Sequence, residues 1–212
     1  MFRRFQPMHR LLFAMLAAAP AFAASPETPA PAAAPAPAGI YLADPAHTSV
    51  TWSLDHLGLS QWTARFVGAE ARLDWRPEDP AASTLTVEID TASVRTDFPA
   101  PEETDMDGMI AGSEDFLAGA PIRFVSTGIE VTGPDTGLVR GDLTLRGETH
   151  PAELRVTFNG SLADHPFTHE AKVGFSALTE IRRSDWGMDV LLPLIGDTVT
   201  VRIETQLAAE ES

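Results

Sequence analysis

The amino-acid sequence predicts an all-β domain of about eight antiparallel strands, with one or two short helical segments. Between residues 40 and 207, apolar and polar side chains alternate in segment after segment, and glycine or proline separates the segments. Alternation with a period of two is typical of strands with one buried and one solvent-facing side. A sheet with this many strands removes its exposed edges by closing into a barrel, although periodicity alone leaves a β-sandwich open.

The clearest pair of strands surrounds a glycine turn. Across residues 152–159 every second side chain is apolar, and the side chains between them are polar or charged. The apolar side of such a strand faces the interior, and the preceding strand of residues 141–147 adds Leu143 and Leu145 to the same wall. A closed sheet of eight strands encloses a space that side chains fill or that holds one small ligand.

The other strands follow from the same alternation. One face of the first strand carries Val50, Trp52, Leu54 and His56. Residues 62–75 are long for a single strand and change phase beside Gly68, which is typical of a β-bulge or a barrel corner. Further half-buried strands are expected at residues 85–89, 122–124, 129–131, 139–145, 171–177 and 199–207.

Residues 96–119 interrupt this pattern. They are rich in Asp, Glu, Met, Gly and Pro, and their apolar residues do not alternate. We expect a loop here, with short helical turns around residues 105–111 and 113–117.

The first residues have the features of a secretory signal peptide. Three arginines (Arg3, Arg4 and Arg10) precede an apolar run at residues 11–19, and Ala21-Phe22-Ala23 follows. The run is shorter than the roughly 20 residues that span a bilayer. Residues 1–23 are therefore expected to be removed after Ala23, which predicts export to the periplasm.

Three further segments complete the predicted organisation. Residues 24–39 are almost entirely proline and alanine, a composition typical of a semi-extended linker. Residues 40–207 form the barrel domain, and residues 208–212 are expected to be a frayed tail.

Composition excludes several classes of partner and site. The formal net charge is −15, and Lys172 is the only lysine. This balance argues against nucleic acid and anionic membrane surfaces as partners, and nothing favours stable membrane insertion. The absence of cysteine excludes disulfides, thiol catalysis and cysteine metal sites.

Several motifs, in the same order, resemble the YceI-like family of exported lipid-binding proteins, also called polyisoprenoid-binding domains. They are Asp-Pro-Ala-His-Thr-Ser-Val (44–50), His-Leu-Gly-Leu-Ser (56–60), Gly-Asp-Leu-Thr-Leu-Arg-Gly (141–147), Gly-Phe-Ser-Ala (174–177), Arg-Ser-Asp-Trp-Gly-Met (183–188) and Gly-Asp-Thr-Val (196–199). The resemblance implies an extended, lipocalin-like antiparallel barrel with an apolar tunnel for an isoprenoid, quinone-like or fatty chain. It implies no catalysis and no cofactor besides the bound lipid.

Residues 105–121 depart from the family pattern. They lack the arginine of a common Arg-Asp pair and are shorter than the family's Phe-Phe-containing segment. If this segment covers the tunnel mouth, the ligand's length or head-group preference changes with it.

The expected tunnel wall combines inward-facing strand residues, several aromatic residues and an apolar loop at residues 190–195. That loop lies between two turn signals, and it serves as a plug of the barrel, as a portal for lipid, or as both. The candidate ligand-binding residues are Val50, Trp52, Leu54, His56, Phe66, Phe116, Phe124, Leu143, Val156, Phe158, Phe175, Trp186, Leu192 and Leu194.

Catalytic and metal sites find little support. His47 and His56 fall on opposite faces of a continuous strand, and neither has a partner at the His-x-His or His-x-x-x-His spacing of a zinc site. Neither a Gly-x-Ser-x-Gly nor a His-Glu-x-x-His motif occurs, so we expect no enzyme and no metal. A hydrolase or isomerase would have to be built around His56 with Asp55 or Asp185.

The sequence therefore predicts a carrier or scavenger of an apolar lipid. The alternative is an acidic protein-interaction module with a solid, lipid-free barrel, which serves a membrane redox protein. A homodimer is left open in either case.

Overall fold

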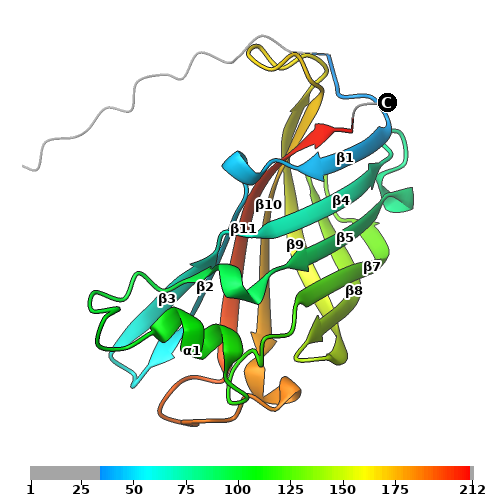
Figure 1. Ribbon diagram of the computed structural model, residues 1–212. Helices are drawn as coiled ribbons and strands as arrows, with labels where there is room; N and C mark the ends of the chain where they lie inside the picture. Colours follow the sequence, from blue (N-terminus) through cyan, green and yellow to red (C-terminus); the bar gives the residue numbers. More distant parts are fainter. Residues whose placement is uncertain (1–33, 211–212) are drawn as a thin grey trace, which may run out of the picture. The chain divides into compact units, whose positions relative to one another are not determined.

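Figure 1 shows a computed structural model of the chain, in which residues 34–210 are described. The expected signal peptide (residues 1–23) and most of the expected linker lie outside these residues. The elements are β1 (Gly39–Ala43), η1 (Pro45–His47), β2 (Ser49–His56), β3 (Ser60–Phe66), β4 (Ala69–Trp75), η2 (Pro80–Ala82), β5 (Thr84–Ile89), η3 (Thr91–Ser93), β6 (Val94–Arg95), α1 (Met106–Gly112), β7 (Ile122–Val131), β8 (Thr136–Leu145), β9 (Glu148–Leu162), β10 (Lys172–Arg182), η4 (Arg183–Trp186) and β11 (Thr198–Ala209).

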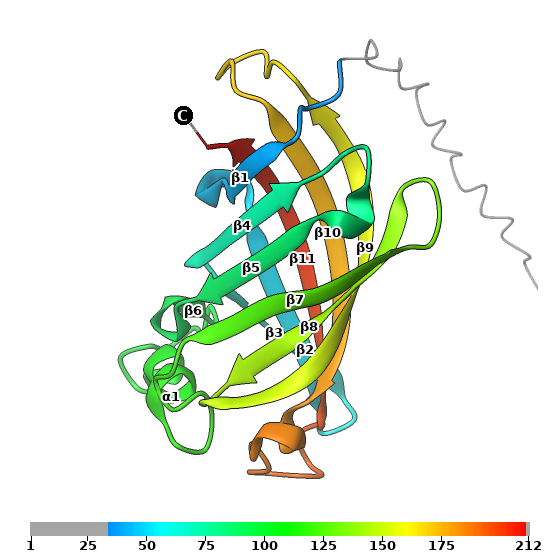
Figure 2. The same cartoon turned by 90° about the vertical axis from the view of Figure 1, so that its right-hand side faces the viewer.

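Eight antiparallel strands close into a barrel, as predicted, but the two strands expected at residues 122–124 and 129–131 are one strand, β7, with a bulge between Ser126 and Gly128. The ring runs β1-β4-β5-β7-β8-β9-β10-β11 and closes where β11 pairs with β1. Figures 1 and 2 show this ring from two sides. Because the ring is closed, the fold is a barrel and not a β-sandwich. The strand edges that an open sheet would expose are paired with each other.

Three further strands extend the wall beyond the ring, and we call β2, β3 and β6 the flap. The flap begins on β11, which pairs with β1 near its end and with β2 through residues 200–204. The corner predicted at Gly68 separates β3 in the flap from β4 in the ring. A Cβ added at Gly68 would lie 2.9 Å from the Cβ of Ser93, so only glycine fits this close approach.

One α-helix lies beside the flap, which agrees with the expectation of one or two short helical segments. α1 packs against η3 and β6, where the sheet ends. The Asp105 carboxylate accepts from the Gly108 amide and caps the helix. The Asp107 carboxylate accepts from the amide and hydroxyl of Thr96, which fixes the helix to the segment after β6.

The core lies inside the barrel, as the alternation predicted. In β9, Leu154 is buried, whereas Glu153 and Arg155 on either side are exposed. A cluster at the flap end includes Val50, Phe66, Val94, Ile110 and Trp186, and a cluster at the opposite end includes Tyr41, Leu73, Trp75, Val173 and Leu207.

Both ends of the domain extend further than the composition indicated. Ala36, which was assigned to the linker, is 1% exposed, and its amide donates to the Ser161 hydroxyl. Residues 208 and 209, which were assigned to the tail, continue β11 and pair with β1. Composition alone missed these contacts because the partners are far away in the sequence.

A buried ion pair fastens η1 to β10. The Lys172 ammonium lies 2.8 Å from the Asp44 carboxylate, and the two side chains are only 7% and 17% exposed. Hydrogen bonds from Lys172 and His47 hold the pKa of the Asp44 carboxyl well below its usual range. The ionised form is therefore the one that the folded protein stabilises.

We expect Asp44→Asn to lower the free energy of unfolding by about 1–2 kcal/mol at pH 7, because the amide removes the charge opposite Lys172 and replaces one of the two accepting oxygens with a donor. The pKa of Asp44 is lower in the folded protein than in the unfolded chain, where it is about 4. The contribution of Asp44 to the free energy of unfolding is therefore complete above about pH 4 and is lost as the pH falls further. Urea denaturation at several pH values checks this. If the free energies of unfolding of the two proteins differ by the same amount at pH 7 and at pH 2, the prediction is wrong.

Candidate functional site

Two adjoining cavities occupy the barrel interior. The first, at the flap end, has a volume of about 360 Å³, and the second, at the opposite end, about 430 Å³. Their walls share five residues, which form the junction between them: Val50, Val87, Ile89, Leu154 and Ile203. The interior is therefore an elongated apolar space rather than a single compact pocket.

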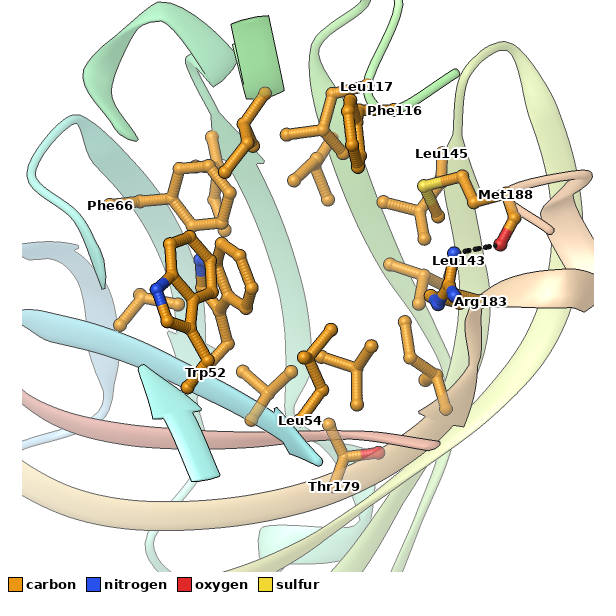
Figure 3. Close-up of a pocket in the computed structure, with 18 of the residues that line it drawn as sticks. Trp52, Leu54, Phe66, Phe116, Leu117, Leu143, Leu145, Thr179, Arg183 and Met188 are labelled. Atoms are coloured by element: carbon orange, nitrogen blue, oxygen red, sulfur yellow. Dashed lines mark hydrogen bonds between the residues drawn. The ribbon is translucent and has the colours of Figure 1, made fainter. Parts of the chain in front are cut away.

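The first cavity is lined from several elements at once. Figure 3 shows Trp52 and Leu54 of β2, Phe66 of β3 and Leu143 of β8 arranged around the same space. Trp52 packs edge-to-face against Trp62, with the ring centroids 5.3 Å apart. These contacts give the apolar wall a fixed shape.

Aromatic rings also form much of the second cavity. Trp75 of β4 stacks on Phe158 of β9, with the ring centroids 5.5 Å apart, and meets the edge of Phe175 of β10. Ala36, from the segment before β1, completes part of this wall. Alternating residues from three strands thus line the end of the barrel opposite the flap.

Segment 105–121 forms one side of the first cavity. Met106, Met109 and Ile110 of α1 line it, together with Phe116 and Leu117. The sequence left open whether this segment covers the tunnel mouth, and the structure shows that five of its residues line the first cavity.

One cation borders this apolar space. Arg183 is 5% exposed and lines the first cavity. Its guanidinium donates to the backbone carbonyls of Met188, Val190, Ile195 and Gly196, at 2.6–2.9 Å. Figure 3 shows the bond to Met188.

Burial lowers the pKa of the Arg183 guanidinium, whereas the charges of Asp197 and Asp189 raise it. An arginine side chain nevertheless keeps its proton at any physiological pH. Its charge is therefore balanced mainly by carbonyl dipoles, and it fastens the loop of residues 188–196 to the barrel.

Most of the candidate residues line a cavity. The first cavity contains Val50, Trp52, Leu54, His56, Phe66, Phe116, Phe124 and Leu143 in its wall. The second contains Val50 again, with Val156, Phe158 and Phe175. That these side chains contact a ligand stays a prediction.

Three candidates lie elsewhere. Trp186 is 3% exposed and belongs to the core; its indole N–H donates to the Glu148 carbonyl, and its ring packs against His150. Leu194 is exposed, and Leu192 is half-buried but lines neither cavity.

Their neighbours Val190, Leu191 and Ile195 line the first cavity instead. The reason is that residues 188–196 form consecutive turns, in which the Leu192 amide donates to Asp189 and the Ile195 amide to Leu191. No period of two applies to such a loop. Alternation therefore could not identify its inward residues, nor the methionines of α1.

The polar cluster that a hydrolase or isomerase would need is not assembled around His56. The Asp55 carboxylate accepts from the Gly58 amide in the β2–β3 turn, and Asp185 is exposed. Within residues 34–210, no hydrogen bond or ion pair joins His56 to either aspartate. No group of acidic residues and histidines in this range is arranged to hold a metal ion.

A family comparison supports the fold. The sequence pattern of the YceI-like domain matches residues 41–207. A UPF0312 protein of Pseudomonas putida strain W619 is 36% identical over 145 residues, which cover 67% of this chain and 71% of that protein. A UPF0312 protein of Pseudomonas fluorescens strain SBW25 is 34% identical over the same shares.

Solved structures share the barrel at lower identity. BcnA of Burkholderia cenocepacia has a TM-score of 0.65 and 20% identity, over 77% of this chain and 98% of that chain. A polyisoprenoid binding domain from Saccharophagus degradans has a TM-score of 0.60 and 15% identity, over 82% and 99%. In the described part of the present chain, no helix has the length and apolar character of a membrane span.

Proposed function

The chain belongs to the YceI-like family, and from this premise we propose that the protein binds an isoprenoid, quinone-like or fatty-chain lipid inside its barrel. The observation that carries the proposal is the elongated interior with its two adjoining cavities: the wall of the first is almost entirely apolar, and the wall of the second is mostly apolar. The structural similarity to a polyisoprenoid binding domain supports it. The protein is a periplasmic carrier or scavenger without catalytic activity.

Burial of the apolar chain supplies the binding energy. If a lipid tail buries several hundred Å² at roughly 25 cal/mol per Å², the gross gain is on the order of 10 kcal/mol. Lost translational, rotational and chain freedom offset a large part of this gain. The resulting affinity depends on chain length more than on the head group, which suits a carrier that serves related lipids.

The alternative, an acidic interaction module, requires a barrel filled by its own side chains. Cavities of about 360 and 430 Å³ favour the lipid-binding function instead. The acidic surface is accounted for by solubility in an aqueous compartment.

Protein purified from its native periplasm is expected to carry an apolar lipid that organic solvent extracts. Native mass spectrometry before and after extraction measures the mass difference, and analysis of the extract identifies the lipid. The control is the extracted protein, which should regain the mass when a polyisoprenoid is added. If the purified protein carries no lipid and the extracted protein takes up none, the proposed function is wrong.

A further inference from the structure

Four leucines lie exposed at the flap end of the barrel, and we call Leu57, Leu59, Leu191 and Leu194 the leucine tip. They are 48%, 83%, 58% and 59% exposed. Leu57 and Leu59 belong to the β2–β3 turn, and the other two to the loop between η4 and β11. Figures 1 and 2 both show this turn beside that loop.

Backbone hydrogen bonds join the two loops into one surface. The Leu57 amide donates to the Leu194 carbonyl at 2.9 Å, and the Gly196 amide donates to the Asp55 carbonyl at 2.8 Å. A β-bridge also pairs His56 with Ile195. The exposed leucines are therefore held together rather than scattered singly over the surface, which distinguishes them from ordinary exposed apolar residues.

Two of these leucines occupy an unfavourable backbone conformation. Leu57 has a φ of 61° and Leu191 a φ of 62°, in the left-handed region that glycine and asparagine adopt more readily. Such a conformation costs a residue with a side chain about 1 kcal/mol or more. Leu57 lines neither cavity and is 48% exposed, so burial offsets little of this cost there, and a role outside folding is the simplest reason for leucine at this position.

The charge distribution indicates the kind of partner. Residues 57–64 and 190–196 contain no charged side chain, in a chain with a net charge of −15. Among the nearby acids, the Asp55 carboxylate is engaged by the Gly58 amide, and Asp189 is exposed at the start of the loop. A basic protein partner would find its complementary charge elsewhere on the molecule, whereas an uncharged apolar tip fits the interface of a neutral lipid bilayer.

The tip is continuous with the first cavity. Leu191 is both exposed and part of the cavity wall, and Val190 and Ile195 of the same loop line the cavity beside it. A surface that inserts here would bring the bilayer next to the cavity. This continuity favours a membrane over a second copy of the chain, which would cover the cavity without supplying lipid.

We propose that the leucine tip docks on the surface of a neutral lipid bilayer and places the first cavity against it, so that lipid passes between the two. The passage of lipid rests on the proposed function, whereas docking does not. Leucine side chains gain about 1.5–3 kcal/mol each when fully buried. A few partly inserted leucines therefore give weak, reversible attachment, which suits a protein that must leave again.

Flotation with vesicles of phosphatidylcholine and phosphatidylethanolamine tests docking. The protein with Leu59→Ser and Leu194→Ser is expected to bind these vesicles at least tenfold more weakly than the unchanged protein. Neither residue lines a cavity, so both proteins should carry the same amount of lipid by mass spectrometry. Binding should change little with salt, and phosphatidylglycerol should weaken it at low salt because the protein is acidic.

Phe167→Ser is the matched control, since Phe167 is 87% exposed in the β9–β10 loop. This variant should bind vesicles normally. The proposal is overturned if the unchanged protein does not float, if the leucine variant floats equally well, or if Phe167→Ser alone loses binding. It is also overturned if the leucine substitutions only convert a dimer into a monomer.

Leu57→Asn separates docking from stability. Asparagine tolerates the left-handed conformation better than leucine does, so the variant should unfold at the same or a slightly higher temperature while binding vesicles more weakly. A variant that unfolds earlier and keeps its vesicle binding would show that Leu57 serves the fold. If the protein floats but never carries lipid, docking stands and the proposed function fails.

Discussion

Replacing Val87 by phenylalanine is expected to weaken the binding of long lipid chains about 100-fold while leaving short chains largely unaffected. Val87 lines both cavities at their junction, so a phenyl ring there separates the two spaces. A chain that loses about four buried methylene groups loses about 3 kcal/mol, at roughly 0.8 kcal/mol for each group. A difference of 1.4 kcal/mol is a factor of ten in affinity, which gives the expected change.

Isoprenoid alcohols of graded length, titrated against the lipid-free protein, provide the measurement. Thr86→Phe is the control, because Thr86 is the exposed neighbour on the same strand and receives the same side chain outside the barrel. Thermal unfolding of both variants shows whether the fold persists. An equal loss of affinity for short and long chains would mean that the two cavities do not hold one extended ligand.

The strands that form this interior could be predicted because burial follows a period of two. In β9, Leu154 and Val156 face the cavities and Arg155 between them faces solvent, as the sequence pattern indicated. The corner at Gly68 could also be predicted from the sequence, because a change in the phase of apolar alternation beside a glycine has few other structural causes.

Closure of the ring depends on contacts that no local pattern carries. β11 uses one edge for two partners, pairing with β1 near its end and with β2 before that. The turn at η1 connects β1 to β2, and its buried ion pair involves Lys172, which is far away in the sequence. The pattern therefore predicted β2 and β3 as strands, but not that they lie outside the ring as part of the flap, and it did not predict β1.

For the loop after η4, the sequence could not predict which side chains face the barrel interior. Residues 190–195 of this loop are all apolar, so composition marks the stretch but does not say which of its side chains face the interior. The buried cation that organises it, Arg183, lies outside the loop, and the sequence shows it only as part of the motif at residues 183–188. A polar residue that holds an apolar loop through backbone carbonyls has no signature in hydrophobic periodicity.

Arg183→Met is accordingly expected to lower the free energy of unfolding by about 3–5 kcal/mol, because each buried carbonyl left without a donor costs about 1–3 kcal/mol and part of this cost is relieved by water or relaxation. Methionine fills similar space but leaves four carbonyls without their donor. The free energy of unfolding of Arg183→Lys should lie between those of the unchanged protein and Arg183→Met. One ammonium group is too compact to donate to all four carbonyls, as the wider guanidinium does. Urea denaturation measures all three proteins.

Arg182→Met is the matched control for this prediction. The Arg182 side chain is 68% exposed and pairs with Asp197 at 3.1 Å, so its removal should cost less than about 1 kcal/mol. Limited proteolysis then locates the effect: in Arg183→Met, cleavage should begin within residues 188–196, before the barrel unfolds. If both variants unfold at the same urea concentration as the unchanged protein, Arg183 does not hold the loop. A loosened loop also uncovers the first cavity, so the same variant should release its lipid faster than Arg182→Met does.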